Sequence, residues 1–363
     1  MRRLFFVLAV VSLTAVPFIL GGCLKDLFPS RPAGTGAPSQ AREGAPGSAG
    51  TESSAPGTPQ SGDLEAAEKL AGAETFVHRF MRYRLLDPFG DRAYAMLTDQ
   101  CKQIFINSSD PTLGGSPVMQ RMVGYRLEGL ARSGSAVVAT VTVWLTGPAE
   151  KAESMYYQEK ITLLPQGEGF AVGAWESSEP VSVYAGRQWT AIVTKKPGAG
   201  EHPVLNISGV PTSFSPQGDN PEQTGRSAGE FKSVAAFPAG PVAFATMGIF
   251  GAVIGVVDAS GQVRVLAEYD NWVHELVWSP GGHYLAVEAM ASSGRHDLAV
   301  FDVKANKRLF LLSGMLPQPG VELNRGCWLD GERYFYFFSR AAEQTPLLWV
   351  LDLKTGQVKA AKV

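Results

Sequence analysis

Apolar residues recur at helical spacing in the stretch that begins near residue 64. Asp63 is a suitable N-cap for a helix starting at Leu64, because its carboxylate can accept from the free backbone N–H groups. A shorter pattern after Gly90-Asp91 predicts a second helix. The apolar positions are Leu70, Ala73, Val77, Phe80 and Met81 in the first helix and Ala93, Tyr94, Met96 and Leu97 in the second.

From residue 125 the period changes to the alternation typical of strands. Tight turns at Ser133-Gly134-Ser135 and at residues 165–169 separate the apolar runs. Helices followed by long antiparallel strands predict an α+β domain with helices on one face of a sheet, at residues 64–186. The predicted strands are Tyr125–Leu130, Ala136–Leu145, Met155–Leu164 and Phe170–Trp175.

An internal repeat organises residues 231–363. Its copies share an aspartate near the end of the third strand, and these equivalents, Asp258, Asp302 and Asp352, are 44 and 50 residues apart. This period fits four-stranded propeller blades. The first recognisable strand of the first copy begins at Val242. The sequence therefore predicts an all-β, propeller-like region of about three four-stranded blades.

Three blades leave open strand edges, because closed propellers typically have at least four. Residues 187–230 add connecting strands at Trp189–Thr194 and Val204–Ser208, followed by a loop rich in Pro, Gly and Ser. These strands are a possible partial blade. We expect an incomplete propeller whose edge is covered by Gln188–Ser208 or by the α+β domain.

One phrase in the middle copy, Trp278-Ser279-Pro280-Gly281-Gly282-His283-Tyr284-Leu285-Ala286, resembles the blade signature of Tol-system and WD-repeat-like propellers. In that signature an aspartate usually precedes the second glycine, whereas this chain has Gly281. Glycine still suits the turn, so the resemblance implies the same blade fold. The blade-end aspartates are expected to form turns by bonding their own backbone.

The segment 64–186 resembles the nuclear transport factor 2-like fold through Ala93-Tyr94-Ala95-Met96-Leu97 and through Trp175 on its final strand. The resemblance implies a cone-like domain with an apolar cavity. Enzymes of that family place an Asp or His base in the cavity. His78 is the single histidine of the segment, and its place next to Val77 indicates a partly buried or surface residue rather than a base.

Before the domains, an apolar run from Leu4 to Leu20 follows Arg2 and Arg3. Its end, Leu20-Gly21-Gly22-Cys23, resembles the signal of bacterial lipoproteins. The resemblance implies a signal peptide at residues 1–22, cleavage before Cys23, and lipid on the Cys23 thiol. An uncleaved membrane anchor, or a signal cut at another site, is the alternative. Each places the folded part outside the cytoplasmic membrane, and the choice of inner or outer membrane stays open.

Residues 23–63 are expected to join the lipid to the folded part as a disordered tether. Of the 34 residues from Pro29 to Gly62, 28 are Pro, Gly, Ser, Ala or Thr. Such a stretch buries too little apolar surface to offset its ordering entropy. Fully extended, it would reach on the order of 100 Å.

Charge argues against a nucleic-acid partner. Without Arg2 and Arg3 the chain has 30 basic residues against 34 acidic ones, and no long basic run. Two cysteines besides Cys23, Cys101 and Cys327, lie in different predicted domains. We expect two buried free thiols, with a disulfide as the alternative in an oxidising compartment.

Motifs for catalysis are missing from the sequence. There is no nucleophile elbow, no second histidine at metalloprotease spacing after His274-Glu275, and no phosphate-binding or EF-hand loop. A metal site from His283, His296 and Asp297 is conceivable, but solvated turn residues are the expected reading. We therefore expect no catalytic residue, no metal and no cofactor.

These observations favour a non-enzymatic lipoprotein that contacts the membrane through Cys23 and binds an envelope protein or a glycan. A small-ligand receptor, or a hydrolase or isomerase using the first-domain cavity, is the alternative. The sequence identifies neither the partner nor the oligomeric state.

Overall fold

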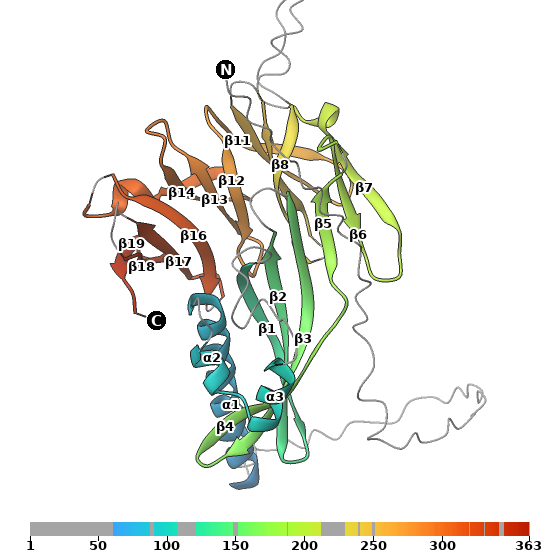
Figure 1. Cartoon of the computed structure of the whole chain (residues 1–363), viewed down its shortest axis with the longest axis vertical. Coiled ribbons are helices and arrows are strands. Elements are labelled where there is room, and N and C mark those ends of the chain that lie inside the picture. The colour runs from blue at the N-terminus through green and yellow to red at the C-terminus, as the bar shows by residue number, and fades with distance from the viewer. Residues whose placement is uncertain are drawn as a thin grey trace, which may run out of the picture. The chain divides into compact units, whose positions relative to one another are not determined.

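A sheet of seven antiparallel strands connects the helices to the rest of the protein (Figure 1). The computed structural model describes residues 61–87, 91–106, 121–147, 152–186, 188–211, 229–238, 240–248, 251–318, 320–329, 331–340 and 345–362. Residues 1–60, with the lipoprotein signal, Cys23 and nearly all of the tether, lie outside the described part. No helix among the described residues is both long and apolar enough to cross a membrane.

The strands of this sheet are β1 (Arg121–Ser133), β2 (Ala136–Thr146), β3 (Glu153–Gln166), β4 (Gly169–Ser177), β5 (Val181–Ala185), β6 (Ala191–Lys195) and β7 (Glu201–Asn206). Strand β3 has 14 residues and pairs with two different strands on one side. Its first part, Glu153–Tyr156, pairs with β5, and its second part, Glu159–Gln166, pairs with β4. Strand β3 therefore connects the part of the sheet that packs on the helices, through β4, to the part that lies against blade 1, through β5.

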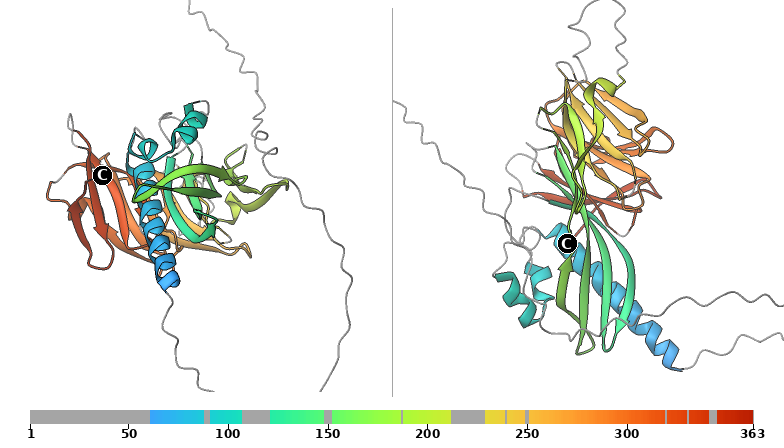
Figure 2. Two further views of the ribbon diagram at one scale, coloured as in Figure 1. Left: turned by 90° about the horizontal axis from the view of Figure 1, so that it is seen from below. Right: turned by 90° about the vertical axis from the view of Figure 1, so that its right-hand side faces the viewer.

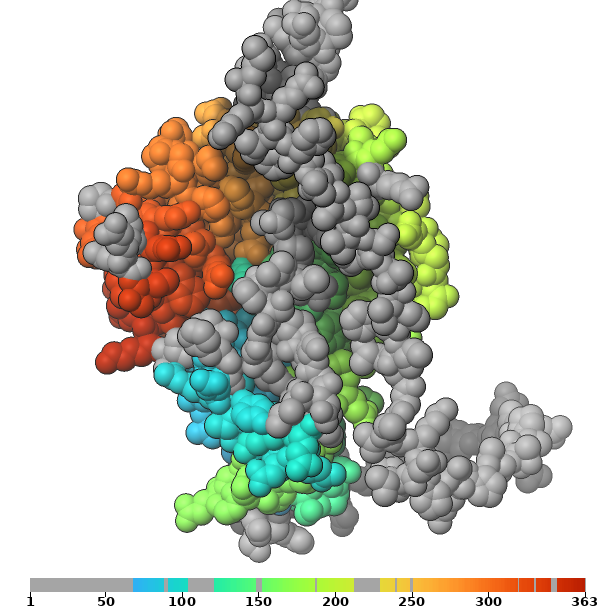
Figure 3. Space-filling model, viewed as in Figure 1, coloured from blue at the N-terminus to red at the C-terminus, as the bar shows by residue number. Residues whose placement is uncertain are grey.

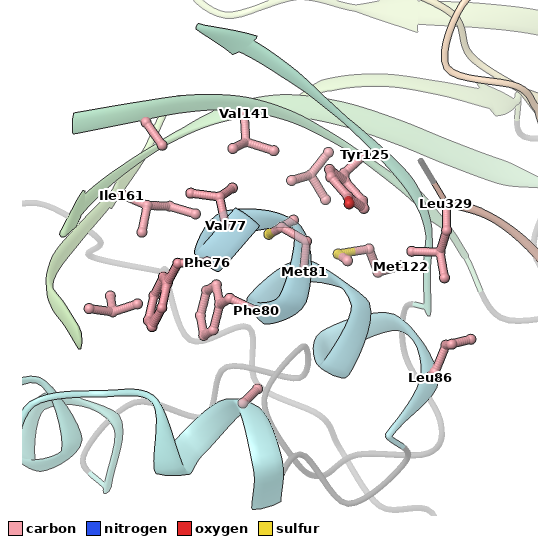
Figure 4. Packing of buried hydrophobic residues seen from close by; sticks show 14 of the residues in the cluster. Phe76, Val77, Phe80, Met81, Leu86, Met122, Tyr125, Val141, Ile161 and Leu329 are labelled. Atoms are coloured by element: carbon pink, nitrogen blue, oxygen red, sulfur yellow. The ribbon is translucent and has the colours of Figure 1, made fainter. Parts of the chain in front are cut away.

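Helix α1 (Ser61–Leu86) lies under the arch of β1–β4 (Figure 4). Ala73, Val77, Phe80 and Met81 are buried against this sheet, as the helical spacing predicts, and Phe76 is buried with them. The second predicted helix is shorter than expected. It ends at Ala95 as α2 (Asp91–Ala95), because the next residues instead bond to β4, where Met96 O accepts from Val172 N at 3.0 Å. A third helix, α3 (Asp99–Ile106), was not predicted.

Three four-stranded antiparallel sheets follow, each with its strands in chain order. We call them blades 1 to 3, and they confirm the predicted repeat. The first copy has one more inner strand than the sequence indicated, β8. The blades comprise β8 (Glu230–Ala235), β9 (Val242–Met247), β10 (Ala252–Val257) and β11 (Val263–Tyr269); β12 (Val273–Trp278), β13 (Tyr284–Met290), β14 (His296–Asp302) and β15 (Lys307–Leu311); and β16 (Glu322–Leu329), β17 (Tyr334–Arg340), β18 (Leu347–Asp352) and β19 (Gln357–Ala360).

The three blade-end aspartates form turns, as expected. Asp258 Oδ1 accepts from Ser260 N at 2.8 Å, and Asp302 and Asp352 make the equivalent bonds to Ala305 and Lys354. Each carboxylate satisfies backbone N–H groups that the tight turn leaves without a strand partner. Their role is therefore local and structural.

The seven-stranded sheet closes the ring that the blades leave open. Strand β8 lies against β3 and β5, β12 against β8, β16 against β13 and β14, and β1 against β16. Figure 2 shows this succession of sheets, and Figure 3 shows blades 2 and 3 and strands β5–β7 on opposite sides of the upper half. The repeats alone are incomplete, as predicted, but the ring has four sides. The fourth side is the seven-stranded sheet, which contains both segments expected to cover the open edge, the strands of the α+β domain and those of Gln188–Ser208.

Tryptophans join neighbouring blades at equivalent positions. Trp278 Nε1 of blade 2 donates to Ala235 O of blade 1 at 3.0 Å. Trp328 Nε1 of blade 3 donates to Val277 O of blade 2 at 3.3 Å. Both indoles are buried, so each bond satisfies a polar group at a blade interface that is otherwise apolar.

Candidate functional site

The first strand of each blade, and the first strand of the seven-stranded sheet, has a β-bulge near its first residues. The register shifts lie between Met122 and Gly124 in β1, Phe231 and Ser233 in β8, Val273 and Glu275 in β12, and Asn324 and Cys327 in β16. A bulge turns a side chain out of the regular alternation, and bulges are frequent next to functional sites. In the three blades the displaced residues include Lys232, His274 and Arg325, all of which have basic side chains.

These bulges surround a polar pocket of about 160 Å³, which we call the axial pocket. All four sheets of the ring contribute to it, and it lies at the end where the inner strands begin. The lining residues are Arg121, Thr146, Gly147, Glu153, Ser233, His274, Glu275, Glu288, His296 and Arg325. Ionisable groups dominate this list, although the surrounding clusters are apolar.

Four of the ionisable groups in the axial pocket form two close pairs. The Arg121 guanidinium donates to the Glu275 carboxylate. Burial raises the pKa of Glu275, while the charge of Arg121 opposes that shift. His296 Nδ1 lies 2.8 Å from Glu288 Oε1, and this hydrogen bond raises the pKa of His296.

His274 stacks on His296 with ring centroids 4.0 Å apart. Burial lowers the pKa of His274, and the charge of the neighbouring His296 lowers it further. His274 Nε2 is buried and has no hydrogen-bond partner among the described residues. A buried polar atom without a partner is uncommon and indicates a position that a bound group can satisfy.

Arg325 has a backbone φ of 55°, in the left-handed region that residues other than glycine seldom adopt. Its backbone N–H donates to Glu288 Oε2 at 3.1 Å, which holds the strained turn in place. The Arg325 side chain is exposed and makes no ion pair with any described residue. Backbone strain of this kind tends to cluster at binding and catalytic sites.

At the opposite end of the ring, Glu332 of blade 3 reaches the signature turn of blade 2. Its carboxylate accepts hydrogen bonds from the Ser279 hydroxyl, from the His283 ring and, at 3.1 Å, from His283 N. A Cβ placed on Gly281 would lie only 2.5 Å from Glu332 Cδ. Glycine at this position, where the resembled signature has aspartate, therefore leaves room for a carboxylate from the next blade. Because the carboxylate lies between the serine and the histidine, the three do not form a nucleophile–base pair.

The three residues considered for a metal do not come together. His283 directly precedes β13, whereas His296 pairs with Met290 at the other end of that strand. Asp297 accepts from Leu298 N and from the Ser313 hydroxyl. Within the described ranges, no group of three or more His, Cys, Asp or Glu side chains is placed to hold a metal ion.

His78 lies at the edge of the helix–sheet core rather than inside it. Its Nδ1 is 2.7 Å from the Tyr125 hydroxyl. Deeper in the same layer, Arg84 donates to both oxygens of Glu159 at 2.6 and 3.0 Å, and neither side chain is exposed (0%). The one buried carboxylate described beneath this sheet is therefore neutralised by a bidentate partner.

Cys101 and Cys327 are free and buried, which agrees with the expected pair of unreactive thiols. Burial raises the pKa of Cys327 to about 12. The predicted lipidation residue, Cys23, and the rest of its motif, Leu20, Gly21 and Gly22, lie outside the described residues.

The sequence does not predict the axial pocket, because its residues read as separate polar interruptions of apolar strands. One signal was available in the repeat. Lys232 lies four residues before Ala236, and His274 lies four residues before Trp278, so blades 1 and 2 have a basic residue at the same repeat position. A basic residue repeated on an inner strand indicates a shared departure from the apolar pattern.

Comparison with known proteins gives structural matches alone. No family model matches the chain, and no curated protein matches it. TolB from Acinetobacter baumannii is 12% identical over 64% of this chain and 56% of that one, with a TM-score of 0.34. The WD40 domain of Toxoplasma gondii coronin is 12% identical over 68% of this chain and 66% of that one, with a TM-score of 0.33.

An uncharacterized protein from Listeria monocytogenes EGD-e is 12% identical over 38% of this chain and 41% of that one, with a TM-score of 0.32. The match thus spans less than half of the length of the Listeria protein and just over half of the length of TolB. No function transfers at such identities and TM-scores. The propeller-like assignment rests on the three repeated sheets.

Proposed function

We propose that this protein is a non-enzymatic, lipid-anchored binding protein of the cell envelope that recognises its partner at the pocket end of the ring. The observation that carries the proposal is the convergence of four bulged strands on one polar pocket. Ionisable groups gathered between apolar sheets do little for stability, since burying charge is costly. Their presence is best accounted for by recognition.

The size of the axial pocket supports contact with one small group. Pockets that enclose whole organic ligands usually measure about 300–1,000 Å³, and this one has about 160 Å³. Trp272 does not line the pocket, but it directly precedes β12, lies two residues before the lining His274 and is 52% exposed. Tryptophan is enriched among the residues that dominate binding energy. A partner that touches the Trp272 rim and places one group in the pocket satisfies both features.

The proposed anchor is lipid on Cys23 in the Leu20-Gly21-Gly22-Cys23 motif. A single acyl chain binds membranes only marginally, whereas two or three chains hold firmly. Because α1 begins at Ser61, three residues before the predicted start at Leu64, the proposed tether is residues 23–60. It would let the ring search a distance on the order of 100 Å from the membrane. We also propose that α1 and β1–β4 are a nuclear transport factor 2-like unit, on the support of a long helix packed under curved antiparallel strands.

Site-specific photocrosslinking in intact cells tests where the partner binds. A photoreactive amino acid replaces Trp272 at the pocket end, or Leu164 as the control. Leu164 is also exposed (39%) but lies on β3 roughly 35 Å along the strand from Glu153, at the far end of the sheet. A specific adduct at position 272 and none at 164 supports the proposal. Equal labelling at both positions, or no adduct at 272, contradicts it.

Mass spectrometry of protein purified from membranes tests the anchor. We expect an N-terminal peptide that begins at Cys23 and has the added mass of diacylglycerol, with or without an amide-linked acyl chain. The Cys23→Ser variant should be released from the membrane fraction. An unmodified Cys23 thiol, or an intact Met1 in the mature protein, would contradict this part of the proposal.

A further inference from the structure

The axial pocket has free charges of both signs, besides the charges that are already paired. Arg121 and Glu275 form one pair, and His296 with Glu288 forms another. Two lining groups remain without an ion pair among the described residues, the Arg325 guanidinium and the Glu153 carboxylate. His274 Nε2 is a third polar group without a hydrogen-bond partner in this part of the chain.

The free Arg325 side chain is held in place by its backbone. Two residues of β16, Arg325 and Gly326, oppose one residue of β17 at the bulge. The left-handed φ of Arg325 and the hydrogen bond from its N–H to Glu288 fix this turn. A strand needs neither feature to continue; both fix the backbone from which the Arg325 side chain leaves, at a residue that lines the pocket.

The balance of charges favours a ligand group that is both cationic and anionic. A simple anion would meet Arg325 but would also face the carboxylates of Glu153 and Glu288. A simple cation would meet Glu153 but would also face the guanidinium groups of Arg121 and Arg325. Only a ligand group with one positive and one negative charge pairs with both the Arg325 guanidinium and the Glu153 carboxylate.

The volume sets the size of that group. The pocket has about 160 Å³, roughly half of the smallest pockets of about 300 Å³ that enclose whole organic ligands, so it suits a group of only a few non-hydrogen atoms. Glycine and alanine, with five and six non-hydrogen atoms, match this volume. A larger amino acid would leave its side chain outside the pocket, towards the Trp272 rim.

We propose that the axial pocket binds a small zwitterion of the α-amino acid class. The carboxylate accepts hydrogen bonds from the Arg325 guanidinium and from the Nε2–H tautomer of His274. The ammonium donates to the Glu153 carboxylate. This inference rests on the proposed function, since it names the chemistry that the binding site takes.

Isothermal titration of the full-length protein in detergent, with alanine and its two single-charge analogues, tests the inference. Propionate lacks the ammonium of alanine, and ethylamine lacks the carboxylate. We expect alanine to bind at least about tenfold more tightly than either analogue, because each lost charge removes a charge-assisted hydrogen bond. Comparable affinity for propionate, comparable affinity for ethylamine, or no heat with alanine would each overturn the inference.

Variants assign the two ends of the ligand. Arg325→Gln should weaken alanine binding about tenfold and leave ethylamine binding unchanged, and Glu153→Gln should weaken alanine and leave propionate unchanged. Arg264→Gln and Glu176→Gln are matched controls, because both side chains are exposed and distant from the lining residues. Arg325→Lys should retain part of the affinity. Equal effects of the controls would contradict the assignment.

The outcome of the alanine titration is independent of the outcome of the crosslinking experiment at position 272. An adduct at position 272 without alanine binding leaves a partner-binding ring whose pocket takes another group. Alanine binding without an adduct at position 272 leaves a small-ligand receptor.

Discussion

Gly281→Asp restores the residue that the resembled blade signature usually has, yet we predict that it destabilises this protein. Gly281 has an ordinary backbone φ, so the effect comes from the side chain. A Cβ there would lie 2.5 Å from Glu332 Cδ and 2.6 and 2.7 Å from its carboxylate oxygens. The new carboxylate would also place a second negative charge beside the first. Glu332 must therefore withdraw from its hydrogen bonds with Ser279 and His283.

Withdrawal of Glu332 relieves the overlap, so the expected loss is that of its hydrogen bonds. Losing a hydrogen bond to a charged group costs about 1.5–3 kcal/mol. The Glu332 side chain is 23% exposed, so water replaces part of this loss. Replacing glycine also restricts the unfolded chain, which returns about 0.4–1 kcal/mol. We predict that the free energy of unfolding falls by about 1–2 kcal/mol.

Urea unfolding of a double-mutant cycle measures this prediction. Glu332→Ala removes the competing carboxylate, so Gly281→Asp in that background should be nearly neutral, because the new side chain has room and can accept from Ser279 and His283. The coupling energy should exceed about 1 kcal/mol. The reasoning is refuted if Gly281→Asp alone leaves the midpoint unchanged, or if the two losses simply add.

Three further changes have defined outcomes. Arg84→Met should lower the free energy of unfolding by about 3–5 kcal/mol in urea melts, because it leaves the Glu159 carboxylate buried without a partner. Adding Glu159→Leu should recover most of the loss, and no recovery would argue against a buried ion pair. The hydrogen bond from the His296 ring to the Glu288 carboxylate raises the pKa of His296 above its unfolded value of about 6.5. The stability lost in His296→Gln should therefore be largest below pH about 6.5 and should shrink as pH rises through the folded pKa; a loss that grows with pH would contradict this sign. Because burial raises the pKa of Cys327 to about 12, its thiol should react with a disulfide reagent only as fast as the protein unfolds, and rapid labelling of the native state would contradict that.

The sequence predicts the parts of this fold that depend on a local period. Helical spacing places Val77 and Phe80 in the core, and the repeat predicts the three blades. It fails where a partner far along the chain decides the outcome. Met96 and Leu97 fit a helix by spacing, but Val172 of β4 bonds on either side of Leu97, donating to Met96 O and accepting from Thr98 N. Tertiary hydrogen bonding overrides a weak local preference in a helix of one or two turns.

The axial pocket was missed for a related reason. A β-bulge is a property of the register between two strands, and the sequence of one strand does not define that register. His274 and Arg325 therefore read as polar interruptions of apolar strands. The left-handed conformation of Arg325 has no sequence signal of its own, because that residue type disfavours it.

The seven-stranded sheet, which is not part of the repeat, closes the ring. It therefore joins the helix-covered part of the protein to the three blades at the axial pocket. A fourth copy of the repeat would have closed the ring and satisfied the same open edges. The chain instead uses β1, β2, β3 and β5, which also connect to the strands that cover α1. Because this sheet is not a blade, it places Arg121 and Glu153 at the axial pocket, where the repeat itself supplies the other charged residues. The pocket consequently has a lining that no single half of the chain contains, and a change in how β1 or β3 meets the blades must alter its charge balance.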